Sequence, residues 1–354
     1  MRYPKFLKDG GTIGFIAPSF GCAIEPYRTR FDRALKDFQL NSYEYTLGPN
    51  CLEGSGTGIS NTPKKCAEEL NNAMTGGAFS DGVVPDVIIT CGGGELMCEV
   101  VPYIDFEKIK NSEPKWYMGY SDNTNYTFLS AILADTAAIY GPCAPAFGRE
   151  PWHRSIEDAL DILRGEVSEV HGFHYFELDD GTAEGEEPDP LAPYNLTEKV
   201  EYKYYHNGSD AKSADIEGRL LGGCLDILTL HAGTKYDKVA EFNERYKEDG
   251  VIWFVESCDL DILSMRRAYW QLREAGWFDT AKGFLIGRPR RCYGEEVFGV
   301  DQYSAVTDIL GDLGVPIIMD LDIGHLPPMM PIVCGSKAKV TAKDNDISIK
   351  YIFE

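Results

Sequence analysis

Ser121 stands between an apolar run, residues 116–120, and a segment expected to be helical, residues 123–134. A strand-to-helix turn of this kind exposes a hydroxyl group. It also directs the next backbone N–H, together with the positive end of the helix, at an oxyanion that forms beside it. The Ser-Asp pair at 121–122 is equally typical of an ordinary helix cap. Ser121 is therefore a candidate nucleophile that needs a base and a second oxyanion donor from elsewhere in the chain.

The candidate base is one of six histidines. His325 follows a buried apolar run, residues 315–319, and is flanked by Gly324 and by a Leu-Pro-Pro sequence. We expect it on a rigid loop at the carboxyl end of a strand, where catalytic groups gather in α/β folds. An ordinary loop histidine is the alternative. The other five lie among polar residues or on a helix-like run: His153, His171, His174, His206 and His231.

Glu256 is the candidate acid that would orient the base, because it comes directly after five apolar residues, 251–255. A buried carboxylate is costly unless a cation or a hydrogen-bond donor meets it. The alternative is a strand-end carboxylate paired with an arginine. Gly92, Gly93 and Gly94 follow another apolar run, residues 87–90, so their backbone N–H groups suit an oxyanion hole. Glu95 beside them argues against a phosphate loop.

Other chemistries have weaker support. Cys91 and Cys143 leave open a cysteine amidotransferase-like enzyme, although neither has an assignable histidine partner. His171 and His174 could share a cation, but no third ligand stands at a matching spacing, so we expect no metal. The paired acids at 186–187 and 295–296 lack the apolar surroundings that raise a carboxyl pKa.

Composition limits the partners that the chain can have. The 34 basic and 56 acidic residues give a net charge of −22, which repels nucleic acid and anionic lipid. No apolar run approaches the roughly 20 residues that cross a bilayer, and the first residues lack a signal-peptide core. The ten cysteines are dispersed, which is typical of reduced thiols. We expect a soluble cytoplasmic protein with no nucleic-acid or membrane partner.

Strand and helix patterns alternate through the first half of the chain, and several strands are apolar on both faces, which predicts a parallel sheet covered by helices. We expect an N-terminal α/β domain over residues 1–170, similar to flavodoxin or amidotransferase folds. An acidic, proline-rich stretch lies within a linker at 171–205. A smaller, barrel-like α+β domain follows over 206–354. It should end in a hairpin around residues 344–346.

Together these segments resemble the LD-carboxypeptidase family of serine peptidases, which includes murein tetrapeptide carboxypeptidases and microcin C immunity peptidases. The resemblance spans nearly the whole chain and rests on Gly11-Thr12-Ile13-Gly14, Ala17-Pro18-Ser19, Gly92-Gly93, Val101-Pro102-Tyr103-Ile104-Asp105, Gly119-Tyr120-Ser121-Asp122-Asn123-Thr124, Tyr140-Gly141-Pro142, Gly218-Arg219, Leu221-Gly222-Gly223, Val255-Glu256-Ser257, Ile286-Gly287-Arg288, Gly324-His325 and Met330-Pro331-Ile332.

The resemblance implies a triad of Ser121 as nucleophile, His325 as base and Glu256 as orienting acid. It implies an oxyanion hole from the backbone N–H groups of Gly93 and Asp122. Gly92 and Gly94 would contact a small peptide or peptide-like substrate. No cofactor is implied, and relatives are commonly homodimers.

The sequences of residues 146–148 and 328–331 resemble those of the microcin-immunity branch. Two departures stand against that branch. No tryptophan lies between Trp152 and Trp253, where that branch commonly has one able to stack on a nucleotide, and Cys224 stands where relatives usually have asparagine. Three hypotheses follow: a serine carboxypeptidase that cleaves a C-terminal L-D amide in murein-type peptides, an amidase of peptidyl or aminoacyl adenylates, and a peptide-binding protein without hydrolysis.

Overall fold

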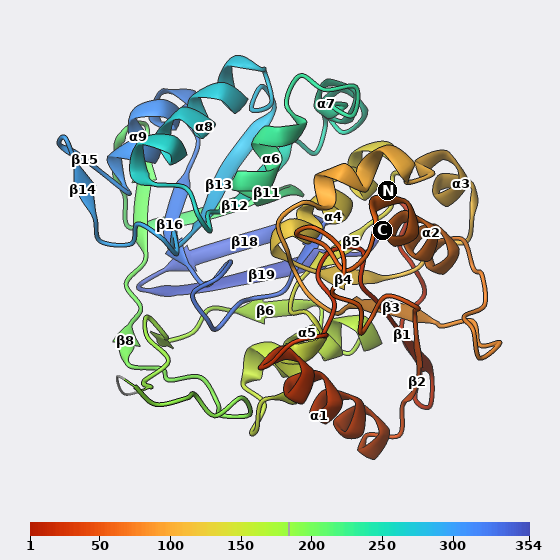
Figure 1. The fold of residues 1–354 in the computed structure, drawn as a ribbon. Helices are drawn as coiled ribbons and strands as arrows, with labels where there is room; N and C mark the ends of the chain where they lie inside the picture. The colour runs from red at the N-terminus through yellow and green to blue at the C-terminus, as the bar shows by residue number, and fades with distance from the viewer. Residues whose placement is uncertain (183–184) are drawn as a thin grey trace. The chain divides into compact units, whose positions relative to one another are not determined.

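The computed structural model describes residues 1–182 and 185–354 and divides them into two compact units (Figure 1). The first unit comprises Met1–Val167 and Asp179–Tyr194. The second comprises Ser168–Leu178 and Asn195–Glu354. The range 171–205, which we expected to be a linker, is thus divided between the two units. Its acidic central part belongs to the first unit.

A parallel sheet forms the centre of the first unit. Its strands are β1 (Thr12–Ile16), β2 (Glu44–Leu47), β3 (Val87–Thr90), β4 (Tyr117–Gly119) and β5 (Ala138–Tyr140). Within this unit they are ordered β5-β4-β3-β1-β2, and neighbouring strands pair in parallel. The mostly parallel N-terminal sheet predicted from the sequence is confirmed. Because the strands are parallel, the loops after β3 and β4 leave the sheet at the same edge.

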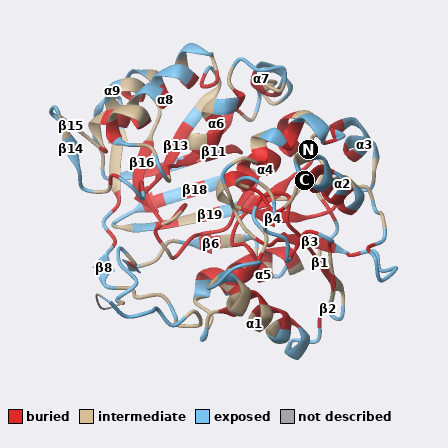
Figure 2. Cartoon of the chain, viewed as in Figure 1, coloured by how far each residue is buried: buried red, intermediate tan, exposed pale blue. Residues whose placement is uncertain are grey.

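The helices of the first unit are α1 (Tyr27–Leu40), α2 (Pro63–Met74), α3 (Phe106–Asn111), α4 (Thr124–Leu133) and α5 (Arg154–Arg164). α1 buries Phe31, Leu35 and Phe38 at helical spacing and leaves its other face to solvent. α4 is buried along almost its whole length. Figure 2 shows this difference as red on α4 and as mixed colours on α1. The turn that carries Ser121 is therefore followed by a helix that is packed into the core.

The second unit is built on one mixed sheet. Its strands are β6 (Glu169–His171), β9 (Lys203–His206), β10 (Ser209–Asp210), β11 (Ser213–Cys224), β12 (Val251–Glu256), β13 (Ala281–Gly287), β16 (Ile317–Leu321), β18 (Lys337–Lys343) and β19 (Asp346–Ile352). The order is β10-β9-β16-β13-β12-β11-β18-β19-β6. The four strands from β16 to β11 are parallel, and the flanking strands are antiparallel. The predicted hairpin is confirmed as β18 and β19.

The second unit also contains the helices α6 (Leu225–His231), α7 (Val239–Arg245), α8 (Ile262–Glu274) and α9 (Ser304–Leu310). Two short strand pairs join β7 (Tyr175–Phe176) to β8 (Glu198–Lys199) and β14 (Glu296–Val297) to β15 (Val300–Asp301). A further short strand is β17 (Ile332–Cys334). Asp261 caps the N-terminus of α8, since its side chain accepts the N–H of Ser264 at 2.7 Å. It packs against α6 and α9. Among the described residues, no helix combines the length and apolar character needed to cross a bilayer.

Candidate active site

Ser121 lies just past the carboxyl end of β4, where the chain turns through a short 3₁₀ helix, Ser121–Asn123, into α4. Its φ is +63°, in the left-handed region that is uncommon for a residue with a side chain. Helix N-caps adopt an extended backbone instead. Strained residues of this kind persist where their surroundings hold them, and they cluster at functional sites. The backbone of this turn therefore suits an exposed nucleophile better than a helix cap.

Asn123 and Tyr140 hold the turn in place. The side-chain nitrogen Nδ2 of Asn123 donates to the carbonyl of Gly92 at 2.8 Å. The side-chain oxygen Oδ1 of Asn123 accepts the hydroxyl of Tyr117 at 2.5 Å. The backbone N–H of Ser121 donates to the hydroxyl oxygen of Tyr140 at 3.1 Å. Asn123 thus ties the glycine turn after β3 to the serine turn after β4. Both residues belong to motifs that carry the family resemblance, at 119–124 and 140–142, but the sequence did not predict that they hold this turn.

The backbone of Gly93 runs beside the Ser121 hydroxyl. A Cβ built on Gly93 would lie 3.1 Å from Cβ and 3.3 Å from Oγ of Ser121. The carbonyl of Gly93 accepts the N–H of Phe20 at 2.7 Å, which orients the turn. Gly94 is more crowded, since a Cβ there would overlap Oγ of Ser19 and would lie 3.1 Å from the nitrogen of Phe20. The oxyanion role of Gly93 and the substrate contacts of Gly92 and Gly94 stay predictions.

The carboxylate of Asp122 is buried beneath the turn. It accepts the Ser19 hydroxyl at 2.5 Å, the N–H of Met97 at 2.9 Å and the side-chain amide of Asn125 at 2.9 Å. Burial raises the pKa of Asp122 to about 6, although the hydrogen bonds from Ser19 and Met97 oppose that rise. The side chain therefore anchors the turn. The predicted oxyanion donor of Asp122 is its backbone N–H, which is a separate group.

The second unit brings Glu256 and His325 together. Glu256 ends β12, and His325 lies on the loop after β16, at the same edge of the parallel strands. Nδ1 of His325 is 2.8 Å from Oε2 of Glu256, and the two side chains are 12% and 0% exposed. A carboxylate in this position holds Nδ1–H and leaves Nε2 to exchange a proton. The sequence-based pairing of these two residues therefore has the geometry of an acid that orients a base.

The charge of Glu256 also tunes the imidazole. Burial disfavours the charged form and by itself lowers the pKa of His325. The negative charge of Glu256 and hydrogen bonds with Cys258 and Glu256 outweigh burial, so the net effect raises the His325 pKa above its ordinary value of 6.5. A raised pKa makes the neutral imidazole a stronger proton acceptor, and it moves to higher pH the range in which that neutral form is present.

Asp226 fixes the loop that follows Glu256. Its carboxylate accepts the N–H of Cys258 at 3.1 Å and the N–H of Asp259 at 2.9 Å. The side chain of Cys258 forms a hydrogen bond with His325. Sequence reasoning missed Asp226. Its one signal was an acid in the first turn of α6, which does not reveal the loop that it reaches.

A buried ion pair anchors the loop that carries His325. Arg288 and Asp322 are 1% and 0% exposed and hydrogen-bond to each other. Arg288 also donates to the carbonyl of Asp320 at 2.7 Å, and Asp322 accepts the hydroxyl of Tyr202 at 2.7 Å. Asp322 is only three residues from His325. The pair thus anchors the loop that carries the candidate base.

The structure gives no support to the cysteine nucleophiles and the metal site that the sequence left open. Burial raises the pKa of Cys91 well above its ordinary value and that of Cys143 to about 11, so both remain thiols near neutral pH and neither suits a cysteine nucleophile. Cys224 is buried and lies opposite Glu256 in the β11–β12 ladder. Across residues 1–182 and 185–354, no three His, Cys, Asp or Glu side chains are grouped so that they could hold a metal ion.

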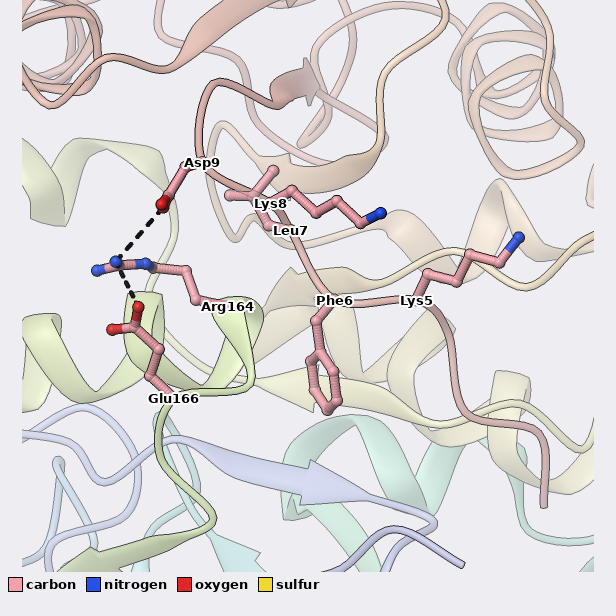
Figure 3. Close-up of a pocket in the computed structure, with 7 residues that line it drawn as sticks. All are labelled: Lys5, Phe6, Leu7, Lys8, Asp9, Arg164 and Glu166. Carbon is pink, nitrogen blue, oxygen red and sulfur yellow. Dashed lines mark ion pairs between the residues drawn. The ribbon is translucent and has the colours of Figure 1, made fainter.

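The first unit has a surface pocket, shown in Figure 3. It is lined by residues 5–9 with Arg164 and Glu166. Residues 5–9 precede β1, so this pocket lies at the amino edge of the sheet, opposite to the carboxyl edge where Ser121 follows β4. Arg164 is already paired with Glu166 at 2.5 Å and with Asp9 at 3.7 Å. The pocket therefore plays no part in the candidate active site.

Comparison with known proteins gives a consistent result. A model of the LD-carboxypeptidase N-terminal domain matches residues 13–141, and a model of the LD-carboxypeptidase C-terminal domain matches residues 217–340. The microcin C7 self-immunity protein MccF of Escherichia coli is 27% identical over 354 residues, which covers 97% of this chain and 94% of that protein. A probable murein peptide carboxypeptidase of Bacillus subtilis is 27% identical over 353 residues, covering 98% and 94%.

The fold agrees with a solved structure of MccF in complex with glutamyl sulfamoyl guanosine. The TM-score is 0.76 at 22% sequence identity, and the match covers 99% of this chain and 98% of that chain. The mixed α/β architecture, with its mostly parallel N-terminal sheet and its C-terminal sheet domain, is therefore shared with that protein.

Proposed function

Because the chain belongs to the LD-carboxypeptidase family, we propose that it is a serine carboxypeptidase that hydrolyses a C-terminal L-D amide bond in murein-type peptides. The observation that carries the proposal is the 2.8 Å contact between Glu256 and His325 at the carboxyl edge of parallel strands. The left-handed backbone of Ser121, next to Gly93, supports it further. Ser121, His325 and Glu256 act in this proposal as nucleophile, base and orienting acid.

In the proposed mechanism, Nε2 of His325 takes the proton of the Ser121 hydroxyl while Oγ attacks the amide carbonyl carbon. The backbone N–H groups of Gly93 and Asp122 hold the oxyanion, and each contributes about 3 kcal/mol to the transition state. His325 then gives its proton to the departing nitrogen, and an acyl-serine remains. A water molecule that loses its proton to His325 releases the acyl group by the same route.

A second candidate is an amidase that acts on peptidyl or aminoacyl adenylates. The likeness to MccF favours it, because a solved structure of that protein holds glutamyl sulfamoyl guanosine. The absence of any tryptophan between Trp152 and Trp253 in the sequence weighs against a stacked nucleotide base. Both candidates use the same residues, so the identity of the leaving group distinguishes them.

Turnover of two substrates tests the proposal. Purified protein is given a tetrapeptide that ends in an L-D amide and, separately, an aminoacyl sulfamoyl adenylate. Faster release of the terminal D-residue supports the carboxypeptidase, and faster cleavage of the sulfamoyl compound supports the amidase. Ser121→Ala and His325→Ala should each lower turnover by about three orders of magnitude or more.

A fluorophosphonate probe locates the nucleophile independently of substrate. Mass spectrometry should find the probe on Ser121 in the wild-type protein. Ser42→Ala is the matched control, since Ser42 is exposed and also has a left-handed backbone, with φ of +66°. Labelling and turnover should survive in that control. Full turnover in Ser121→Ala, with the probe on another residue, would contradict the proposed nucleophile.

A further inference from the structure

The loop after β13 brings a cation close to the Glu256–His325 pair. The N–H of Arg290 donates at 2.9 Å to the carbonyl of Ser257, the residue that follows Glu256. Nη1 of Arg290 donates to the sulfur of Cys258 at 3.5 Å, and the Cys258 side chain in turn hydrogen-bonds with His325. These contacts all lie within the second unit. A short path therefore joins the guanidinium to the imidazole.

The side chain of Arg290 is exposed enough for an outside anion to reach its guanidinium. Its side chain is 55% exposed, and its ion pair with Asp259 spans 3.7 Å, with the Asp259 side chain 63% exposed. Exposed pairs of this kind contribute little to stability. An incoming carboxylate can therefore replace Asp259 at little cost. The planar fork of arginine also suits a carboxylate, which it can hold through two parallel hydrogen bonds.

We propose that Arg290 binds the terminal carboxylate of the substrate and so selects the last residue of a peptide. This inference rests on the proposed carboxypeptidase function. In a C-terminal residue, the nitrogen that departs and the carboxylate are bonded to the same α-carbon. When His325 protonates that nitrogen, the carboxylate lies beside the imidazole, within reach of Arg290. A local cation is needed there because a chain with a net charge of −22 otherwise repels anionic substrates.

Arg291 offers a matched control. It carries the same charge at the next position, and its N–H donates to the carbonyl of Cys258 at 3.2 Å. Its guanidinium donates to the backbone carbonyl of Asp259 at 3.0 Å rather than to a side chain that touches His325. Changes at Arg290 and Arg291 therefore remove equal charge from the same loop, and only the change at Arg290 removes the proposed contact.

The test compares a tetrapeptide that ends in a free carboxylate with the same peptide ending in a carboxamide. In the wild-type protein, the acid should be the better substrate. Arg290→Gln should lower kcat/KM for the acid by about 10- to 100-fold, chiefly through KM, because a charge-assisted hydrogen bond is lost. The carboxamide should be unaffected. Arg290→Lys should restore part of the preference, and Arg291→Gln should retain it in full.

An acid-to-carboxamide ratio that is the same in Arg290→Gln and in the wild type would overturn the inference. An equal loss in Arg291→Gln would also overturn it, since general charge would then explain the effect. Calorimetric binding of both peptides to Ser121→Ala, with and without Arg290→Gln, separates this inference from the proposed function. Arg290-dependent binding without any hydrolysis by the wild type would reject the hydrolase and keep the carboxylate site. Hydrolysis by the wild type without an Arg290-dependent preference for the acid would reject the carboxylate site and keep the hydrolase.

Discussion

Gly324 lies directly against the carboxylate of Glu256. A Cβ built on Gly324 would be 2.5 Å from Oε2 and 2.7 Å from Cβ of Glu256, and the backbone φ of Gly324 is +107°. Both the space and the backbone conformation therefore exclude a side chain. Because His325 follows immediately, this glycine lets the chain pass close enough for the imidazole to reach the carboxylate.

Gly324→Ala should lower kcat/KM by about a hundredfold, because a small displacement of a catalytic group has an effect of that order. Turnover of the L-D tetrapeptide is the measurement. Gly314→Ala is the control. Its φ is +72°, so alanine is strained there too, but the nearest atom to its Cβ is Oδ1 of Asn207 at 3.4 Å. Both variants should lose stability, and only Gly324→Ala should lose activity. Wild-type rates in Gly324→Ala would show that the approach to Glu256 is not needed.

The acid limb of the pH–rate profile should report the influence of Glu256. Since the raised His325 pKa lies above 6.5 and the neutral imidazole is the base, kcat/KM should rise with pH and reach half its plateau above pH 6.5. Glu256→Gln removes the negative charge, so the limb should move to lower pH while the plateau falls. Glu241→Gln, at an exposed carboxylate paired with Lys238, should leave the profile unchanged. An unmoved limb in Glu256→Gln would contradict this account.

The sequence predicted the Glu256–His325 pair because each residue had a local signal. Glu256 ended an apolar strand where an unpartnered carboxylate would be costly, and His325 followed another apolar run. The resemblance to a family then assigned them to each other. Parallel strands supply the physical reason that they meet, since β12 and β16 both run in parallel with β13 and end at the same edge.

Other features depend on contacts between distant segments and left no local signal. Asp226 reaches a loop 32 residues further along the chain. β11 (Ser213–Cys224) contains Gly218, Gly222 and Gly223, which weaken a strand pattern, so the sequence alone does not predict this strand. Pairing with β12 on one side and β18 on the other overrides that low propensity.

The buried Arg288–Asp322 pair should matter more for stability than an exposed pair of the same kind. Asp322→Asn leaves the buried guanidinium uncompensated and should reduce the free energy of unfolding by about 3 kcal/mol, measured in urea. Asp312 pairs with Arg273 at 2.7 Å but is 67% exposed. Asp312→Asn should therefore change stability by less than about 1 kcal/mol. Equal losses in the two variants would refute the anchoring role of Asp322.

Gly93→Ala should slow the chemical step with little effect on folding. The added Cβ would press on Cβ of Ser121 at 3.1 Å and on Oγ at 3.3 Å, so the hydroxyl and the proposed oxyanion donor would have to separate by a few tenths of an ångström. We expect kcat to fall by about a hundredfold. Labelling of Ser121 by the fluorophosphonate probe should slow in parallel.

Gly54→Ala is the matched control for this crowding, since its Cβ would meet Cβ of Ala23 at 3.0 Å rather than the side chain of Ser121. Both variants should unfold at similar urea concentrations, because each must accommodate one crowded methyl group. Only Gly93→Ala should lose turnover and labelling. If kcat were unchanged in Gly93→Ala, the backbone beside Ser121 would have no part in stabilising the oxyanion, and the second donor would have to be sought at another residue.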